Sequence, residues 1–204
     1  MNVEPITLEG RTIRLEPLSF DHHAALCEVA FDDDIWRWTT TMIRTPEDLR
    51  AYIETALKWQ SEGHALPFAI IEQACGRAVG STRFGNIERA HRRVEIGWTW
   101  IGKNWQRTPV NTEAKYLMLR HAFEMWRCIR VELKTDVLNE RSRQAILRIG
   151  AKQEGVFRQH MIMPGGRIRD SVYYSIVDTE WPAVRAGLEE RLSIPYVPRM
   201  TEAG

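Results

Sequence analysis

Hydrophobic residues recur with a period of two in some segments and of three to four in others, which predicts alternating strands and helices. Residues 12–18 form the first expected strand, because Ile13 and Leu15 alternate with polar neighbours. Helical patterns follow at 21–30 and 45–62. The second of these begins with a capping threonine, Thr45, and a proline in its first turn, and Gly63 ends it.

The rest of the chain continues this alternation and predicts one α+β domain with a seven-stranded sheet. No internal repeat or linker interrupts the pattern. The last two strands are turned by Pro164-Gly165-Gly166, and Pro195, Pro198 and Gly204 indicate a loose tail. The remaining expected elements are strands at 66–73, 78–87 and 93–101, a helix at about 111–126, a strand at 131–137, a helix at 140–149, strands at 155–163 and 168–177, and a helix at 181–192.

Composition narrows the class of protein. The chain has 204 residues, of which 44% are hydrophobic and 27% charged, as expected for one globular domain. Its 28 Lys and Arg against 27 Asp and Glu give no broad attraction to nucleic acid or to an anionic membrane. No apolar run approaches the roughly 20 residues of a membrane span, and we identify no export signal.

Three cysteines, Cys27, Cys75 and Cys128, are widely spaced along the chain. Their odd number and spacing fit neither a disulfide framework nor paired metal ligands, so we expect a cytoplasmic protein. The six histidines form no ligand pattern either, and we expect no metal.

The loop after the strand at 93–101 is the most informative segment. It runs from Trp105 to Lys115 and opens an amphipathic helix. Unpaired amides at a helix start, together with the helix dipole, can hold a phosphate without a metal. Such a loop is more often an ordinary helix entry than an anion site, so the loop by itself leaves both readings open.

The order of the elements and this loop resemble the GNAT acyltransferases, and more narrowly their RimJ/RimL-type branch. The resemblance covers about residues 8–178, with 179–204 as a C-terminal helix and tail. It implies a mixed, mostly antiparallel sheet that splays between its fourth and fifth strands, where the pantetheine arm of acyl-CoA inserts. It also implies acetyl transfer from acetyl-CoA to a primary amine, either a protein N-terminus or a small molecule.

The resemblance assigns cofactor contacts to the loop. The pattern of Gln or Arg, Gly, any residue, Gly, any residue, and Gly or Ala falls on residues 106–111, and both loop glycines are replaced, by Arg107 and Pro109. A guanidinium at position 107 can bind pyrophosphate with two hydrogen bonds. The expected cofactor-binding residues here are Trp100, Ile101, Gln106, Arg107, Thr108, Val110, Asn111 and Thr112.

A second stretch, residues 139–155, resembles the segment that holds the pantetheine arm in this family. The resemblance places Asn139 beside the arm and Ser142 near the thioester sulfur, where its hydroxyl can protonate the leaving thiolate. Asn139 is also a good helix cap, which alone would explain it. Arg141 and Arg148 lie on similar helix faces and can meet the CoA phosphates, although an arginine in such a position is more often simply solvated.

Glu95 is conspicuous in a strand of β-forming residues. Strict alternation places it on one face with Gly97, Thr99 and Ile101, opposite Trp98 and its neighbours. The resemblance makes it the general base that collects the acceptor's proton. The alternative is a surface carboxylate that pairs with Arg92 or Arg83 across strands; burial distinguishes the two.

The acceptor is less clear from the sequence. Asp34, Trp36 and Trp38 fall where the family walls its acceptor site, and acidic and aromatic side chains favour a cationic amine. Solvated acids and core tryptophans are the alternative. A different possibility is recognition of a carboxylate, on the acceptor or on a succinyl-type donor, by the closing-hairpin residues Arg158, His160, Arg167 and Arg169.

Two rival functions remain open from the sequence. Because the loop lacks both glycines, the chain can be a degenerate acyl-CoA-binding or interaction protein without turnover. A nucleotide-binding module is disfavoured, since the sequence has no Walker lysine pattern and no dinucleotide fingerprint. A homodimer through the closing hairpin or the last helix is also open.

Overall fold

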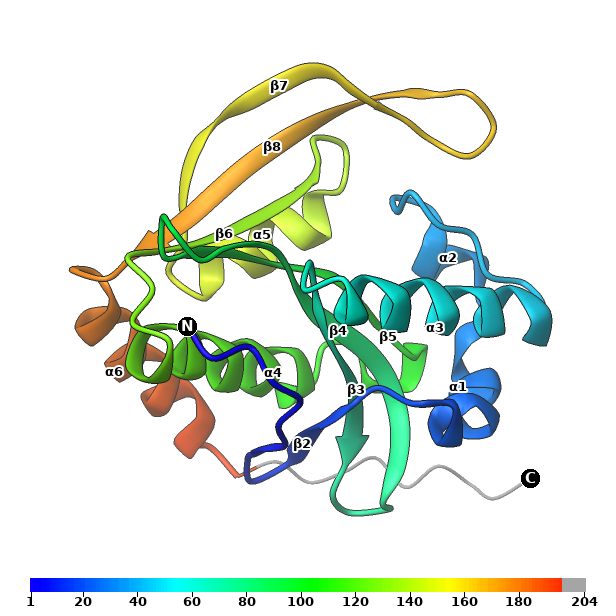
Figure 1. Cartoon of the computed structure of the whole chain (residues 1–204), viewed down its shortest axis with the longest axis horizontal. Coiled ribbons are helices and arrows are strands. Elements are labelled where there is room, and N and C mark those ends of the chain that lie inside the picture. Colours follow the sequence, from blue (N-terminus) through cyan, green and yellow to red (C-terminus); the bar gives the residue numbers. More distant parts are fainter. Residues whose placement is uncertain (196–204) are drawn as a thin grey trace.

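The computed structural model describes residues 1–195, and the expected tail over 196–204 lies outside the described residues. Eight strands form one sheet in the order β1-β2-β3-β4-β5-β6-β8-β7 (Figure 1). The short β1 is the strand that the hydrophobic pattern misses, because two residues are too few to show a period. The strands are β1 (Leu8–Glu9), β2 (Ile13–Pro17), β3 (Leu66–Glu72), β4 (Arg77–Glu88), β5 (Arg93–Ile101), β6 (Arg130–Asp136), β7 (Lys152–Ile162) and β8 (Ile168–Val177).

The helices agree closely with the sequence pattern. Thr45 caps α3, and its hydroxyl and the Asp48 carboxylate form the reciprocal bonds of a capping box. The helix expected from about residue 111 starts earlier, at Pro109, because Thr108 caps it. The helices are α1 (His23–Ala30), α2 (Asp33–Trp36), α3 (Pro46–Ser61), α4 (Pro109–Arg120), α5 (Glu140–Arg148) and α6 (Trp181–Ser193), with 3-10 turns at Phe20–His22 and Lys103–Trp105 and a π turn at His121–Met125.

The sheet is splayed at one place. All neighbouring strands are antiparallel except β5 and β6, which are parallel. Their pairing runs only from Arg93 opposite Arg130 to Glu95 opposite Glu132. From Ile96 onward β5 has no β6 partner, so its edge is left open as the two strands diverge. This is the splay that the family resemblance implies.

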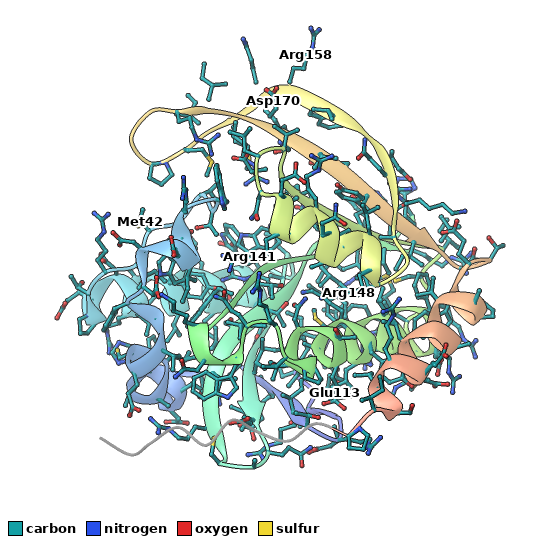
Figure 2. The ribbon with its side chains drawn as sticks, turned by 180° about the vertical axis from the view of Figure 1, so that it is seen from behind. Met42, Glu113, Arg141, Arg148, Arg158 and Asp170 are labelled. Carbon is teal, nitrogen blue, oxygen red and sulfur yellow. The ribbon has the colours of Figure 1, made fainter. Side chains whose placement is uncertain are left out.

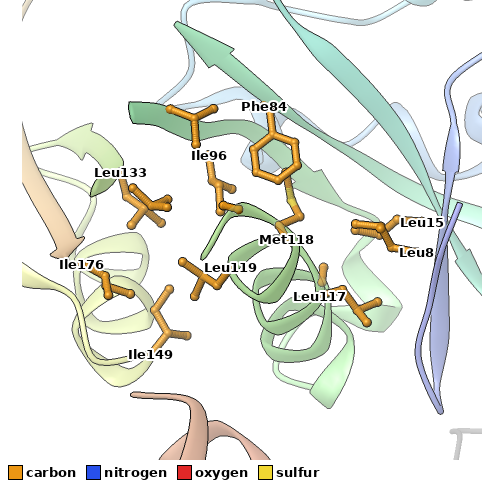
Figure 3. Packing of buried hydrophobic residues seen from close by; sticks show 14 of the residues in the cluster. Leu8, Leu15, Phe84, Ile96, Leu117, Met118, Leu119, Leu133, Ile149 and Ile176 are labelled. Carbon is orange, nitrogen blue, oxygen red and sulfur yellow. The ribbon is translucent and has the colours of Figure 1, made fainter. Parts of the chain in front are cut away.

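Two hydrophobic clusters cover opposite faces of the sheet. The larger one contains α4, whose Leu117 lies on the side of Leu8 and Leu15 and whose Leu119 lies on the side of Leu133 and Ile176 (Figure 3). The smaller one joins α1, α2 and α3 to β3, β4 and Trp100 of β5. The second face is therefore covered by helices only over the first half of the sheet.

A β-bulge in β5 changes which residues share a face. Gly97 is opposite Arg83 and Trp100 is opposite Ser81, so Trp98 and Thr99 together face Thr82. Trp98 takes a left-handed φ of 50°. The prediction from strict alternation was therefore wrong, because one extra residue reverses the alternation beyond Gly97.

After the bulge the two faces of β5 are clear. Val94, Ile96 and Ile101 belong to the cluster under α4, whereas Trp100 belongs to the cluster under α3. Glu95 alternates with Val94 and Ile96 and so lies on the α3 face. It shares that face with Trp98 and Trp100, not with Thr99 and Ile101.

Glu113 of α4 fixes the N-terminal strand to this helix. Its buried carboxylate accepts hydrogen bonds from the backbone amides of Arg11, Thr12 and Ile13, at 2.7, 2.8 and 2.9 Å. A carboxylate that replaces three water contacts with three amides is well compensated for its burial. This contact holds the edge of the sheet against the helix that begins at the candidate cofactor loop.

The hairpin of β7 and β8 arches away from the rest of the sheet (Figure 1). Phe157 is opposite Ser171 and Met161 is opposite Arg169, so three β7 residues lie across from Asp170 alone. Gln159, in the middle of them, has a φ of 50° and donates its amide to the Asp170 carboxylate at 2.6 Å. This irregularity turns His160 toward the inner side of the hairpin, where its ring lies 5.7 Å from that of Tyr173.

Candidate active site

The loop before α4 retains a glycine-like conformation without glycine. Arg107, which occupies the first glycine position of the family pattern, has a φ of 60°. Thr108 then caps the helix: its hydroxyl accepts from the Val110 amide at 3.3 Å and donates to the Trp105 carbonyl at 2.6 Å. Pro109 occupies the first helical turn, where a missing amide hydrogen costs least. The loop thus keeps an exposed guanidinium beside a capped helix start.

Gln106 connects the loop to both neighbouring elements. Its amide nitrogen donates to the Ile101 carbonyl at 2.9 Å, and its amide oxygen accepts from Arg141 at 2.8 Å. The first contact holds the end of β5 and the second reaches α5 across the splay. Gln106, Arg107, Ile101 and Arg141, which the sequence assigned to the cofactor, are therefore close together around the splay.

The start of α5 supplies the other expected cofactor residues. Asn139 caps the helix, since its side-chain oxygen accepts from the Ser142 amide at 3.1 Å. The capping role is thus present, and the Asn139 amide nitrogen is left for another partner. Arg141 and Arg148 are both exposed and lie on the face seen in Figure 2.

Glu95 is buried on the opposite, α3 side of the splay. Its side chain is 2% exposed, and one carboxylate oxygen accepts from Asn86 at 2.7 Å and from Lys134 at 2.8 Å. It forms no pair with Arg92 or Arg83, so the expected alternative of an exposed cross-strand pair is wrong. Only Oε2 is engaged, which leaves the other oxygen available to a bound molecule.

A cavity of about 550 Å³ opens onto Glu95. Its lining includes Asn86 and Tyr173, and its other walls carry charged residues that pair with one another. Arg130 binds Glu154 at 2.5 Å and Glu132 at 2.9 Å, so these side chains compensate one another. A polar, water-accessible space beside a buried carboxylate is suited to proton removal from an entering group.

His160 lies at the same side of the sheet. Its ring is 5.7 Å from Tyr173, and the Lys134 nitrogen is 5.6 Å from the Tyr173 ring. The Nδ1 atom of His160 is buried without a hydrogen-bond partner. Burial lowers the pKa of His160, and the positive charges of Lys134 and Arg169 act in the same direction, against an opposite effect of Glu95. His160 is therefore largely neutral at pH 7.

The segment expected to wall the acceptor site, from Asp34 to Trp38, is only partly exposed to a bound molecule. Trp36 is 2% exposed, donates to the Ala30 carbonyl at 2.7 Å and packs 5.2 Å from the Trp100 ring. It is a core residue, as the alternative reading of the sequence held. Trp38 is half-buried, and the guanidinium of Arg167 lies 5.3 Å from its ring.

The acidic triplet at the start of α2, Asp32 to Asp34, is largely neutralised. Asp32 caps α2 and pairs with Lys103 at 3.2 Å, while Asp33 pairs with Arg44 at 3.0 Å. Asp34 is exposed, and no described cation pairs with it. The structure therefore removes most of the negative charge that favoured a cationic acceptor.

Lys115 lies beneath the β5 bulge on the α4 side. Its ammonium nitrogen is 2.5 Å from the Thr99 hydroxyl and 3.3 Å from that of Thr82, and these two hydroxyls are 2.8 Å apart. Burial lowers the pKa of Lys115 to about 7. Nothing in the sequence indicated that Lys115 is buried against these hydroxyls, because a lysine near a helix start is usually solvated.

Sequence reasoning also missed Lys134 and Asn86, the two partners of Glu95. Both belong to strand patterns in which a polar residue is expected to face solvent. The sequence offered one signal for Lys134: it is a charged residue within the alternating pattern of β6, the strand next to the splay. Only the register, with Lys134 opposite Tyr173, shows that it faces Glu95.

Two further kinds of site were sought in the described residues. Over 1–195, no group of three or more His, Cys, Asp or Glu side chains is arranged to hold a metal ion. No helix in that part of the chain is long and apolar enough to cross a bilayer.

Comparison with known proteins gives consistent results. The family profile described as "Acetyltransferase (GNAT) domain" matches residues 12–152. A Bacillus subtilis (strain 168) protein named "Putative ribosomal N-acetyltransferase YdaF" is 34% identical over 106 residues, which are 52% of this chain and 57% of that protein. The chain thus aligns with little more than half the length of this relative.

Solved structures show the same fold. A structure described as a "putative acetyltransferase from T. thermophilus" superposes with a TM-score of 0.85 and 39% identity, covering 94% of this chain and all of that one (100%). The structure named "Mycobacterium smegmatis RimJ in complex with CoA-disulfide" superposes with a TM-score of 0.79 at 23% identity, over 92% of this chain and 95% of that one. At that identity the second likeness shows the fold alone.

Proposed function

From the premise that this chain belongs to the GNAT acetyltransferase family, we propose that it transfers an acetyl group from acetyl-CoA to a primary amine. The acceptor is a protein N-terminus or a small molecule, and the amine attacks the thioester directly. The observation that supports this best is the splay between β5 and β6, with a helix start on its cofactor side and the buried Glu95 on the other.

The residues around the splay fit an acyl-CoA. Arg107, Arg141 and Arg148 are exposed cations that can contact its phosphates, and the half-buried Asn111 adds a polar side chain to the first turn of α4, where Thr112 is buried. The unpaired edge of β5 near Trp100 offers amides to the thioester carbonyl. Acetyl-CoA supplies an acetyl group already activated as a thioester.

Glu95 acts as the general base in this proposal. It is buried and fixed by Lys134 and Asn86, and its second oxygen is available to take a proton from the attacking amine. Ser142, half-buried at the start of α5, protonates the leaving thiolate. No covalent enzyme intermediate is needed, because both substrates can be held on opposite sides of the same strand.

The nature of the amine determines how much help it needs. An α-amine with a pKa near 8 costs roughly 1 kcal/mol to deprotonate at pH 7, whereas a lysine amine costs about 4.6 kcal/mol. This favours an α-amine as the acceptor.

Calorimetric titration with acetyl-CoA tests the first requirement. Free CoA and ATP serve as controls, because ATP shares the phosphates but lacks the pantetheine arm. We expect micromolar binding of acetyl-CoA and of CoA and none of ATP. No heat with acetyl-CoA would instead favour a degenerate family member that acts through a partner.

Succinyl-CoA belongs in the same titration, because the hairpin carries several arginines. Binding of succinyl-CoA at least tenfold tighter than acetyl-CoA would assign a succinyl-type donor. Equal or weaker binding keeps acetyl-CoA as the donor.

A further inference from the structure

The charged side chains on the α3 side of β6 and β8 are paired, with one exception. Lys134 pairs with Glu95, and Arg167 pairs with Asp136. Arg169 forms no ion pair with any carboxylate of the described residues. It is nevertheless 94% buried, with 6% of its surface exposed.

The contacts of Arg169 are all with neutral groups. Its Nε donates to the Ser171 hydroxyl at 2.9 Å, and one terminal nitrogen donates to the Trp38 carbonyl at 3.4 Å. Burying a cation without a counter-ion is costly, and a buried guanidinium is normally paired. The fold therefore holds a buried guanidinium without a direct ion pair between β8 and the segment that contains Trp38, and the Asp136 and Glu95 carboxylates act on it only through space.

Arg169 lies on the same face as Glu95. Val172 and Tyr174 of β8 pack in the cluster under α4, so Arg169, Ser171 and Tyr173 point to the opposite side. The register continues this face across β6, because Tyr173 is opposite Lys134, the partner of Glu95. Arg169 does not itself line the cavity beside Glu95, but the Glu95 charge acts on it through space, so a molecule that enters past Tyr173 is within reach of both groups.

A second buried cation on this face serves a different purpose. Arg83 is 1% exposed and lies 4.8, 5.6 and 5.4 Å from the rings of Tyr52, Trp59 and Trp98. Three aromatic faces offset much of the cost of burying its charge. Arg169 has no such cage, which makes it the guanidinium that requires an anion.

We infer that the acceptor of this enzyme carries a carboxylate close to its amine, and that Arg169 binds this carboxylate while the amine lies at Glu95. The inference rests on the proposed function and names the substrate class of that same site. The carboxylate can be that of a free α-amino acid, or the side chain of an acidic residue at the start of a peptide. Both place an anion within a few bonds of a primary amine.

Matched pairs of amines test the inference. Thiol release from acetyl-CoA is measured with the common α-amino acids and with their carboxamides, which lack the negative charge of the carboxylate. Because amidation also lowers the pKa of the α-amine, kcat/KM is compared per unprotonated amine. A second arm compares short peptides that begin with Asp or Glu with the same peptides that begin with Asn or Gln. We expect kcat/KM for the acid to exceed that for its amide by about 10- to 100-fold in one arm, the difference that a charge-assisted contact provides.

Arg169→Gln supplies the second half of the test. It should raise KM for the preferred acid by about the same factor, with kcat little changed, and leave kcat/KM for the matching amide nearly as it was. If Arg169 were only structural, its substitution would lower kcat/KM for the acid and for the amide equally. Arg158→Gln is the matched control, because Arg158 is exposed on the outer side of the same hairpin (Figure 2).

Three outcomes are distinguishable. An acid preference that disappears in Arg169→Gln supports the inference. Amides accepted as well as acids, or an acid preference that survives in Arg169→Gln, overturns it and leaves the acetyltransferase proposal intact. If neither the acids nor the amides cause thiol release from acetyl-CoA, the proposed function itself is wrong. If Arg169→Gln does not fold, the acid and amide comparison in the unaltered enzyme still decides.

Discussion

Gln106, Arg107 and Thr108 follow one another in a single loop, whereas Glu95, Lys134 and His160 come from three different strands. In the proposed function the first group lies on the cofactor side of the splay and the second on the acceptor side. The cofactor side depends on local backbone conformation, in particular on the left-handed Arg107 and the cap at Thr108. The acceptor side depends on strand register and on two bulges.

This difference predicts different responses to mutation. A change in the loop should alter one binding step, because its residues are exposed and contact few others. A change on the acceptor side should alter the chemistry, because its groups are buried and share hydrogen bonds. Substitutions at three positions test this contrast.

Glu95→Gln should have the largest effect. Loss of the proton acceptor should lower kcat by about 10²- to 10⁴-fold at pH 7 while the Kd for acetyl-CoA stays within a factor of about two. Steady-state kinetics and calorimetry measure the two quantities. Glu88→Gln, in the same cavity, should keep nearly full activity. Equal activity in Glu95→Gln and the parent would exclude Glu95 as the base.

Lys115→Met should affect stability and its pH dependence. Burial lowers the pKa of Lys115 from 10.5 to about 7, so between these values the unfolded chain binds a proton that the native state does not. The free energy of unfolding should therefore rise from pH 7 to pH 10 in the parent. Removing the lysine should stabilise the protein by roughly 1–3 kcal/mol at pH 7. The free energy of unfolding should then rise less steeply with pH than it does in the parent.

Denaturant unfolding at pH 7, 8, 9 and 10 measures this effect. Lys58→Met is the control, because the Lys58 side chain is 72% exposed. An unchanged pH slope in Lys115→Met would show that Lys115 is charged in the native state. Because Lys115 contacts Thr99 in the bulge, a loss of kcat in the same variant would link the cofactor helix to the acceptor side.

Arg107→Ala and Arg107→Gly should have the smallest effect. Both remove the guanidinium, so both should raise the Kd for CoA by about 10-fold, as one charge-assisted contact to phosphate does. They should differ in stability, because the φ of 60° suits glycine and strains alanine by roughly 1 kcal/mol. Calorimetry and thermal unfolding check the two predictions. A glycine variant that binds CoA as tightly as the parent would show that the backbone alone holds the pyrophosphate.

The order of strands and helices could be predicted because most elements carry their own period and their own caps. Thr45, Gly63 and the Pro164-Gly165-Gly166 turn all mark boundaries close to the observed ones. The fold followed from these local signals together with the family resemblance. The two-residue β1 and the one-turn α2 were missed, because neither is long enough to show a period.

The acceptor side could not be predicted to the same extent, because its geometry depends on residues that break the strand period. Trp98 adds one position to β5, and a bulge around Gln159 turns His160 inward. Neither residue is a glycine, so their left-handed conformations could not be recognised, and only Gly97 beside Trp98 indicated an irregular strand. The burial of Glu95 and its pairing with Lys134 emerged only from the assembled sheet.

The bond network of Glu113 constrains the order in which the chain can fold during synthesis. Its carboxylate holds the backbone of residues that lie 100 to 102 positions earlier. At roughly 5–20 residues per second, a ribosome needs about 5–20 s to make the intervening chain. For that time the first long strand lacks its helix contact, and its exposed edge can pair with other chains. The nascent protein thus depends on the prompt arrival of α4 for the closure of its N-terminal edge.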